Sequence, residues 1–138
     1  DSVDALNYLK QYFKLVVLTN TDNQSFQGSN ARLGVTFDSV YTAEDIGSYK
    51  PNDRNFGYML TALARQGIEK SDILHTAESM FHDHAPANKH LVPNCWIYRR
   101  HDKKGFGATM DPVKMPSYNF MFHSMADLVK AHKAELSK

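Results

Sequence analysis

Six polar residues stand just after the apolar segments of this chain, at positions where their side chains could do chemistry together. They are Thr19, Asn20, Lys50, Glu78, Ser79 and Asp83. A hydroxyl and an amide can hold an anionic group, and a lysine can neutralise charge that develops on a nearby carboxylate. The two carboxylates could bind a hard cation such as Mg²⁺. The set therefore predicts a site for an anionic group, with or without a metal ion.

Each of these residues also has an ordinary structural explanation. Thr and Asn after a strand are common turn or cap residues. A single lysine before a proline, as at Lys50, is more often a solvated loop residue. Glu78 and Asp83 are equally well explained as acids that interact with the dipole at the start of a helix. The residues taken one at a time are weak indications, so their order along the chain matters more.

Alternating strands and helices are predicted to position these residues. The predicted strands are residues 14–20, 37–42, 73–77 and 94–98. The predicted helices begin at Ser2, at Asp22 and at Asp53, and two more cover residues 82–90 and 124–136. This order predicts an α/β protein with a Rossmann-like parallel sheet and helices on both faces. Ligands bind beyond the carboxyl ends of such strands, where the six polar residues lie.

Particular apolar residues support these assignments. Leu6, Leu9 and Phe13 follow Ser2, a plausible N-cap, at helical spacing. The run from Leu15 to Leu18 is continuously apolar, which is typical of a strand covered on both faces. Residues 99–118 are rich in Lys, Gly and Pro and predict a surface loop.

Composition predicts one domain and excludes several functions. The chain has 138 residues, 42% of them hydrophobic, which suffices for a single core. Its 16 Lys and Arg residues and 15 Asp and Glu residues form no basic stripe, so nucleic acid is not an expected partner. Its apolar runs fall far short of the ~20 residues that span a bilayer, so no membrane is expected. The single Cys95 has apolar neighbours, which predicts a buried thiol and favours a cytoplasmic location.

The order of the polar residues resembles the haloacid dehalogenase superfamily, in which a strand-terminal Thr or Ser, then a Lys, then a pair of acids follow a catalytic Asp. LTN (18–20) resembles the second motif, SYKP (48–51) the third, and TAESMFHDHAPA (76–87) the fourth. The type II 2-haloacid dehalogenases are the most similar branch, through SYKPNDRNF and PNCWIYRR. The resemblance extends over residues 1–131.

The resemblance implies a role for each candidate residue. Thr19 and Asn20 would bind the anionic group of the substrate, and Ser79 would also contact the substrate. Lys50 would stabilise the nucleophile, and Asp83 would orient Lys50 or the attacking water. The nucleophile would be an aspartate that forms a covalent intermediate.

The first motif of the superfamily, an apolar strand that ends in Asp, is absent from the sequence. Neither Asp1 nor Asp4 follows an apolar strand, and the helical cap that normally follows this motif is missing too. In the superfamily this strand lies between the strands that here end at Asn20 and Ala77. Without it, those two strands would be ~9.6 Å apart and each would expose an unpaired edge. We expect a fragment of a longer polypeptide; the alternatives are that the two strands pair directly or that another chain supplies the missing strand.

The resemblance therefore implies a hydrolase that, as a complete protein, acts on a small anionic substrate such as a 2-haloacid through an upstream Asp. It would need no cofactor. One alternative is a phosphatase of the same superfamily, in which Glu78 and Asp83 would hold Mg²⁺. Another is a non-catalytic binding protein that kept the fold and lost the nucleophile. The 138-residue chain alone is predicted to be inactive.

Overall fold

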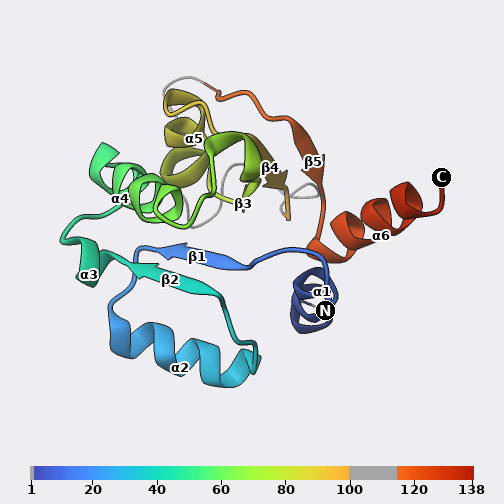
Figure 1. Cartoon of the computed structure of the whole chain (residues 1–138), viewed down its shortest axis with the longest axis horizontal. Helices are drawn as coiled ribbons and strands as arrows, with labels where there is room; N and C mark the ends of the chain where they lie inside the picture. The colour runs from blue at the N-terminus through green and yellow to red at the C-terminus, as the bar shows by residue number, and fades with distance from the viewer. Residues whose placement is uncertain (1, 100–114) are drawn as a thin grey trace. The chain divides into compact units, whose positions relative to one another are not determined.

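The computed structural model describes residues 2–99 and 115–138 as parallel strands that alternate with helices (Figure 1). The chain divides into two compact units, one of residues Asp1–Gly47 and Ser124–Lys138 and the other of residues Ser48–His123. Every ladder between the described strands is parallel, which confirms the predicted α/β class. The prediction that residues 1–138 form one incomplete domain stays a prediction. None of the helices within the described ranges is both long and apolar enough to cross a membrane.

The first unit contains one sheet of two strands. Its elements are, in chain order, α1 (Ser2–Lys10), β1 (Val16–Thr19), α2 (Asn23–Leu33), β2 (Ser39–Thr42), α3 (Ala43–Ile46) and α6 (Met125–Leu136). β1 and β2 pair in parallel with Thr19 opposite Thr42, so both strands end at the same edge of the sheet. Helices α1 and α6 pack on each other through Ala5, Leu9 and Val129.

Capping residues explain where these helices begin and end. The helix predicted to begin at Asp22 is α2. The Asp22 carboxylate accepts a hydrogen bond from the Ser25 backbone N–H, and Gly34 ends the helix with a φ of 65°. Ser124 caps α6 in the predicted way. The prediction for α1 was partly wrong, because the helix already includes Ser2 and ends at Lys10. Phe13 therefore lies beyond the helix and is 50% exposed.

The second unit contains a three-stranded sheet. Its elements are α4 (Asp53–Ala64), η1 (Lys70–Asp72), β3 (His75–Ala77), the π-helical turn η2 (Met80–His84), α5 (Ala85–Lys89), β4 (Asn94–Ile97) and β5 (Phe120–Phe122). β4 is the middle strand, between β3 and β5 (Figure 1). Its four residues are all buried, and burial raises the pKa of Cys95 to about 11. The predicted buried thiol is confirmed.

Two features of the second unit differ from the sequence prediction. The helix predicted over residues 82–90 begins earlier, with η2 at Met80, because Ser79 accepts a hydrogen bond from the His82 backbone N–H and caps the turn. Strand β5 was not predicted, since three residues are too few to show an alternating pattern; it is held by pairing with β4, with Phe120 opposite Cys95. Of the predicted loop over residues 99–118, residues 100–114 lie outside the described residues.

The order of strands within each sheet is simple. β1 pairs with β2 in the first sheet, and β3 pairs with β4 in the second. Direct pairing of β1 with β3 stays an untested alternative. The four residues of β1 are only half-buried. The prediction that this apolar strand is covered on both faces was therefore wrong for this chain.

Candidate active site

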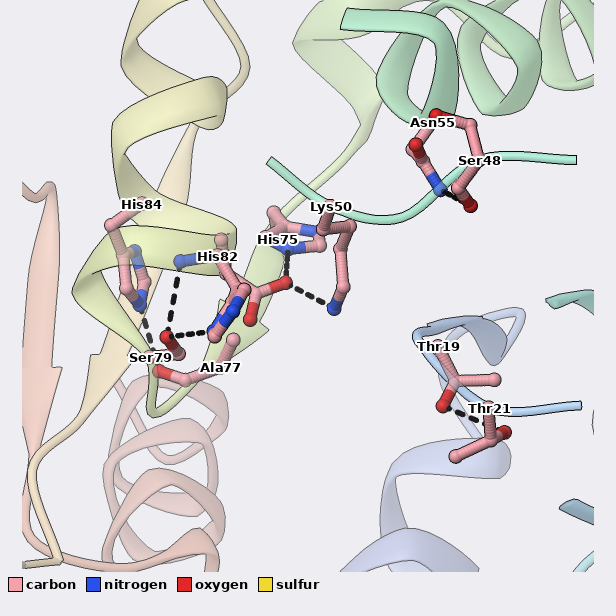
Figure 2. Close-up of polar contacts among 11 residues, drawn as sticks. Thr19, Thr21, Ser48, Lys50, Asn55, His75, Ala77, Ser79, His82 and His84 are labelled. Atoms are coloured by element: carbon pink, nitrogen blue, oxygen red, sulfur yellow. Dashed lines mark hydrogen bonds and ion pairs between the residues drawn. The ribbon is translucent and has the colours of Figure 1, made fainter. Parts of the chain in front are cut away.

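A buried ion pair in the second unit joins two of the predicted residues. Lys50 Nζ donates a hydrogen bond of 2.6 Å to Asp83 Oδ1 (Figure 2). The two side chains are only 10% and 9% exposed. Lys50 lies in the segment before α4, and Asp83 lies in η2, just beyond the carboxyl end of β3. The structure thus brings together the third and fourth motifs at the edge of the sheet where the sequence predicted a site.

A third residue, His75 of β3, contacts the same carboxylate oxygen. The distance from His75 Nε2 to Asp83 Oδ1 is 2.9 Å, and Figure 2 shows the lysine and histidine contacts meeting at one atom. An ionised carboxylate only accepts hydrogen bonds, so Nε2 carries the proton and donates. The sequence analysis did not include His75. The available signal was a histidine within the predicted strand 73–77, because a buried polar side chain requires a partner.

The two donors decide the charge state of Asp83. Burial penalises the charged carboxylate and by itself would raise its pKa. The hydrogen bond from His75 and the positive charge of Lys50 outweigh burial and hold the pKa of Asp83 well below its usual range. Asp83 is therefore an anion at neutral pH, and it gives Lys50 a fixed, charged partner away from bulk water.

Helix α4 fixes the backbone that leads to Lys50. Asn55, which is fully buried, donates from Nδ2 to the Ser48 carbonyl oxygen at 2.8 Å (Figure 2). Asn52 caps the helix by accepting a hydrogen bond from the Arg54 backbone N–H. The Oδ1 atom of Asn55 is buried and has no hydrogen-bond partner among the described residues. An unpaired buried acceptor destabilises the fold, so Oδ1 does not explain why an amide stands here. The hydrogen bond from Nδ2 to Ser48 does.

Phe56 holds the ring of His75 from the side. This phenylalanine is fully buried, and its ring meets that of His75 edge to face with centroids 4.9 Å apart. The ring of His90 stacks on Phe56 at 5.5 Å, and His90 Nε2 is 3.2 Å from Asp53 Oδ1 at the surface. Packing on Phe56 therefore limits the orientations that the His75 ring can adopt.

The hydroxyl of Ser79 is used within η2. It accepts the His82 backbone N–H at 3.1 Å and forms a second hydrogen bond of 3.0 Å with His82 Nδ1 (Figure 2). The carbonyl oxygen of the preceding residue, Glu78, accepts a hydrogen bond from Trp96 Nε1 at 2.9 Å. These contacts fix the turn that carries Asp83. The substrate-binding role of Ser79 stays a prediction.

A second histidine of η2, His84, is buried and neutral. Its Nε2 donates to the Ala77 carbonyl oxygen at 2.7 Å, and the Asn94 amide donates to its Nδ1 at 3.0 Å. Asn94 Nδ2 donates because Nδ1 of this tautomer can only accept. Burial lowers the pKa of His84, despite the hydrogen bond to Ala77. This histidine links η2 to β3 and β4 and is a structural residue.

The other two predicted residues, Thr19 and Asn20, belong to the first unit. The Thr19 hydroxyl is 3.1 Å from that of Thr21, in an exposed pair just beyond the end of β1 (Figure 2). Asn20 follows directly after the strand. Their position at the carboxyl end of a parallel strand matches the sequence analysis. The expected convergence of Thr19 with Lys50 on one substrate stays a prediction.

Asn23 organises the end of the first sheet. The Thr42 hydroxyl donates to Asn23 Oδ1 at 2.6 Å. The backbone N–H of Asn23 donates to Glu44, and its Nδ2 donates to Asp45, both at 2.9 Å. The two acids, which the sequence placed between the second strand and Lys50, therefore join the start of α2 to α3.

The magnesium alternative stays a prediction. The resemblance named Glu78 and Asp83 as ligands in that case, and Asp83 Oδ1 accepts hydrogen bonds from Lys50 and His75. A cation bound to Asp83 would therefore use Oδ2 and would lie close to the positive charge of Lys50. Within residues 2–99 and 115–138, there is no cluster of three His, Cys, Asp or Glu side chains that could hold a metal ion.

Comparisons with known proteins identify similar structures but no similar sequence family. No family model and no curated protein matches the sequence. The L-2-haloacid dehalogenase of Xanthobacter autotrophicus, solved with chloropropionic acid covalently bound, matches with a TM-score of 0.77 and 18% identity over 96% of this chain. A HAD phosphatase of Thermococcus onnurineus matches with a TM-score of 0.71 and 22% identity over 96% of the chain.

A third match is the HAD-hydrolase YfnB of Bacillus subtilis, bound to magnesium, with a TM-score of 0.75 and 17% identity over 93% of the chain. This chain spans 60%, 56% and 53% of the lengths of the dehalogenase, the phosphatase and YfnB. At these identities the matches show that the fold is shared. They include both a dehalogenase and a phosphatase, so the fold alone does not choose between the two reactions.

Proposed function

We propose that this chain, which has the fold of the haloacid dehalogenase superfamily, is part of a hydrolase that acts on a small anionic substrate such as a 2-haloacid. The nucleophile is an aspartate that lies outside residues 1–138. The rest of the same polypeptide supplies it, on the strand that forms the first motif of the superfamily. Residues 1–138 alone lack this carboxylate and do not turn over substrate.

The observation that carries this proposal is the buried pair of Lys50 and Asp83. Lysine rarely lies in a buried position unless it is paired, and here the Lys50 side chain is 10% exposed at the end of a parallel sheet. The negative partner is held at the same time by His75. A lysine fixed in this way supplies a positive charge whose position does not need to be reorganised during a reaction.

Such a charge fits displacement by a carboxylate. The aspartate attacks the carbon that bears the leaving group, a new C–O bond forms, and halide leaves with the bonding electrons. Water then hydrolyses the resulting ester, which releases the 2-hydroxy acid and restores the carboxylate. Lys50 stabilises the carboxylate before attack and after hydrolysis, and Asp83 holds Lys50 in place. Thr19, Asn20 and Ser79 contribute hydroxyl and amide groups to binding of the substrate.

Halide release without a metal ion is favoured over magnesium-dependent phosphatase activity. The reason is that Lys50 and His75 both donate to Asp83, the residue that a magnesium site would require. The phosphatase alternative is testable by the same assay. The reducing cytoplasm remains our proposal for the location, since it suits a buried free thiol at Cys95.

The test uses the complete polypeptide that contains this chain. Chloride release from 2-chloropropionate and phosphate release from a generic ester are measured with Mg²⁺ and with EDTA. We expect chloride release that EDTA does not change. In the Lys50→Ala variant, kcat should fall by about 10² or more, because an interaction that stabilises charge in the reaction is lost.

Lys89→Ala is the matched control. Lys89 also pairs with an aspartate, Asp53, at 2.8 Å, but its side chain is 67% exposed. We expect its kcat to equal that of the unchanged protein. Phosphate release that requires Mg²⁺ would show that the protein is a phosphatase and not a dehalogenase. The absence of both activities would favour a binding protein that has lost its nucleophile.

A further inference from the structure

His75 is placed to control the orientation of the Asp83 carboxylate. Its Nε2 and the Lys50 ammonium approach the same oxygen, Oδ1, from two different segments, at 2.9 and 2.6 Å. A carboxylate held by one donor can rotate about its terminal bond, whereas two donors at one oxygen define where that oxygen lies. With His75 present, Oδ1 has one position, and Lys50 is directed to that position.

The histidine itself has little freedom. Its side chain is 11% exposed, and its ring packs edge to face against the fully buried Phe56. Phe56 lies in α4, one residue after the Asn55 that fixes the Ser48 carbonyl. The same turn of α4 therefore positions the backbone before Lys50 and the ring that holds the partner of Lys50.

We propose that His75 is a positioning residue, which acts by donating from Nε2 to Asp83 Oδ1 and so keeps the Lys50 ammonium in one place. Its effect on turnover rests on the proposed function, but its effect on Lys50 does not. The hydrogen bond is what matters in this role. An uncharged donor at the same position should replace it, and an apolar side chain of similar bulk should not.

Two substitutions separate these requirements. His75→Gln keeps an N–H donor near the position of Nε2, and His75→Leu removes the donor while it retains apolar bulk. His90→Gln is the matched control, because His90 also packs on Phe56 and pairs with a carboxylate, but that carboxylate is Asp53. Thermal unfolding of each variant of the complete polypeptide shows whether it is folded.

The first measurement is the ¹⁵N NMR signal of the Lys50 ammonium in the complete polypeptide, assigned by its loss in Lys50→Arg. A buried, hydrogen-bonded ammonium exchanges its protons slowly enough to be seen. We expect the signal in the unchanged protein, in His75→Gln and in His90→Gln, and its loss in His75→Leu. Retention of the signal in folded His75→Leu, or its loss in folded His75→Gln, would overturn the proposal.

The second measurement is steady-state hydrolysis of 2-chloropropionate. In His75→Leu we expect kcat to fall by between about 10- and 10²-fold, with KM changed by less than about twofold. The reason is that the displaced Lys50 ammonium would act in the transition state more than in substrate binding. His75→Gln should restore most of kcat, and His90→Gln should not change it. If the unchanged protein does not hydrolyse the substrate, the proposed function fails, and the Lys50 signal alone decides the role of His75.

Discussion

Strands β4 and β1 have the same length but differ in burial. All four residues of β4 are buried, although the strand begins with the polar Asn94. All four residues of β1 are half-buried, although three of them are aliphatic. The strands differ in their neighbours, because β4 lies between β3 and β5 while β1 pairs, among the described strands, with β2. Neighbours, more than side-chain polarity, decide how deeply a strand is buried.

The candidate site shows the same contrast. In the second unit, Lys50, His75 and Asp83 form a buried cluster whose charges are matched within that unit. In the first unit, Thr19 has an exposed hydroxyl paired with that of Thr21. The second unit therefore holds its reactive charge in place by its own contacts. The first presents its candidate residues at the carboxyl end of β1, which pairs with β2.

The largest effect on stability should come from breaking the buried cluster. Asp83→Ala removes the buried carboxylate that both Lys50 and His75 contact, and breaking a buried ion pair costs about 3–5 kcal/mol. Asp53→Ala removes a carboxylate that also has two basic partners but is 56% exposed, and it should cost less than about 1 kcal/mol. Urea unfolding of the 138-residue chain measures both values. Equal losses in the free energy of unfolding would mean that the buried cluster stabilises the chain no more than the exposed ion pair does.

The comparison of the strands predicts a second difference. Ile97→Ala in β4 should cost about 3 kcal/mol, because Ile97 is 2% exposed, and Leu18→Ala in β1 should cost less than about half of that. Both substitutions delete the same number of carbon atoms. If the complete polypeptide covers β1 with another strand, the cost of Leu18→Ala should rise there toward that of Ile97→Ala. An unchanged cost would argue against a strand at that edge.

The sequence predicted the elements well where a local signal exists. The helices predicted to begin at Asp22 and at Asp53 are observed as α2, which Asp22 caps, and as α4. Strand β5 has no such signal, because its three residues are ordered by pairing with β4. Burial of β1 was overestimated for the same reason, since burial depends on neighbours that a local pattern does not contain.

Within the site, order along the chain predicted that Asp83 would orient Lys50 or the attacking water, and Asp83 lies 2.6 Å from the Lys50 ammonium. His75 was missed because its role depends on two distant contacts, with Asp83 and with Phe56. Neither contact follows from the composition of a short strand. A histidine in an apolar segment marks a position where a buried partner is needed, but it does not say which partner.

The buried histidine of η2 should make the second unit sensitive to acid. Burial lowers the pKa of His84 in the folded chain. Below about pH 6.5 this histidine is therefore protonated in the unfolded chain before it is protonated in the folded chain. Stability should fall as pH decreases from about 7 to 5, by at most about 1.4 kcal/mol per pH unit. The depressed pKa of Asp83 acts in the same direction but only below about pH 4.

The measurement is urea unfolding of the chain at pH 7, 6 and 5. His84→Gln removes the titrating group, so its stability should depend less on pH over this range, although it is lower at pH 7. His82→Gln is the control, because His82 lies in the same turn and its side chain contacts Ser79. Equal pH dependence in the unchanged chain and in His84→Gln would show that another group causes the acid sensitivity.

The smallest effect on stability is expected at the exposed end of β1. Thr19→Val and Thr21→Val each remove one hydroxyl of an exposed pair, and each should change the free energy of unfolding by less than about 0.5 kcal/mol. The two variants should differ in binding. In the complete polypeptide, Thr19→Val should raise KM for 2-chloropropionate about tenfold, because an anionic group loses a donor worth about 1.5 kcal/mol. Thr21→Val should leave KM unchanged. Equal KM values for the two variants would show that Thr19 does not bind the substrate. The candidate site would then consist of residues of the second unit.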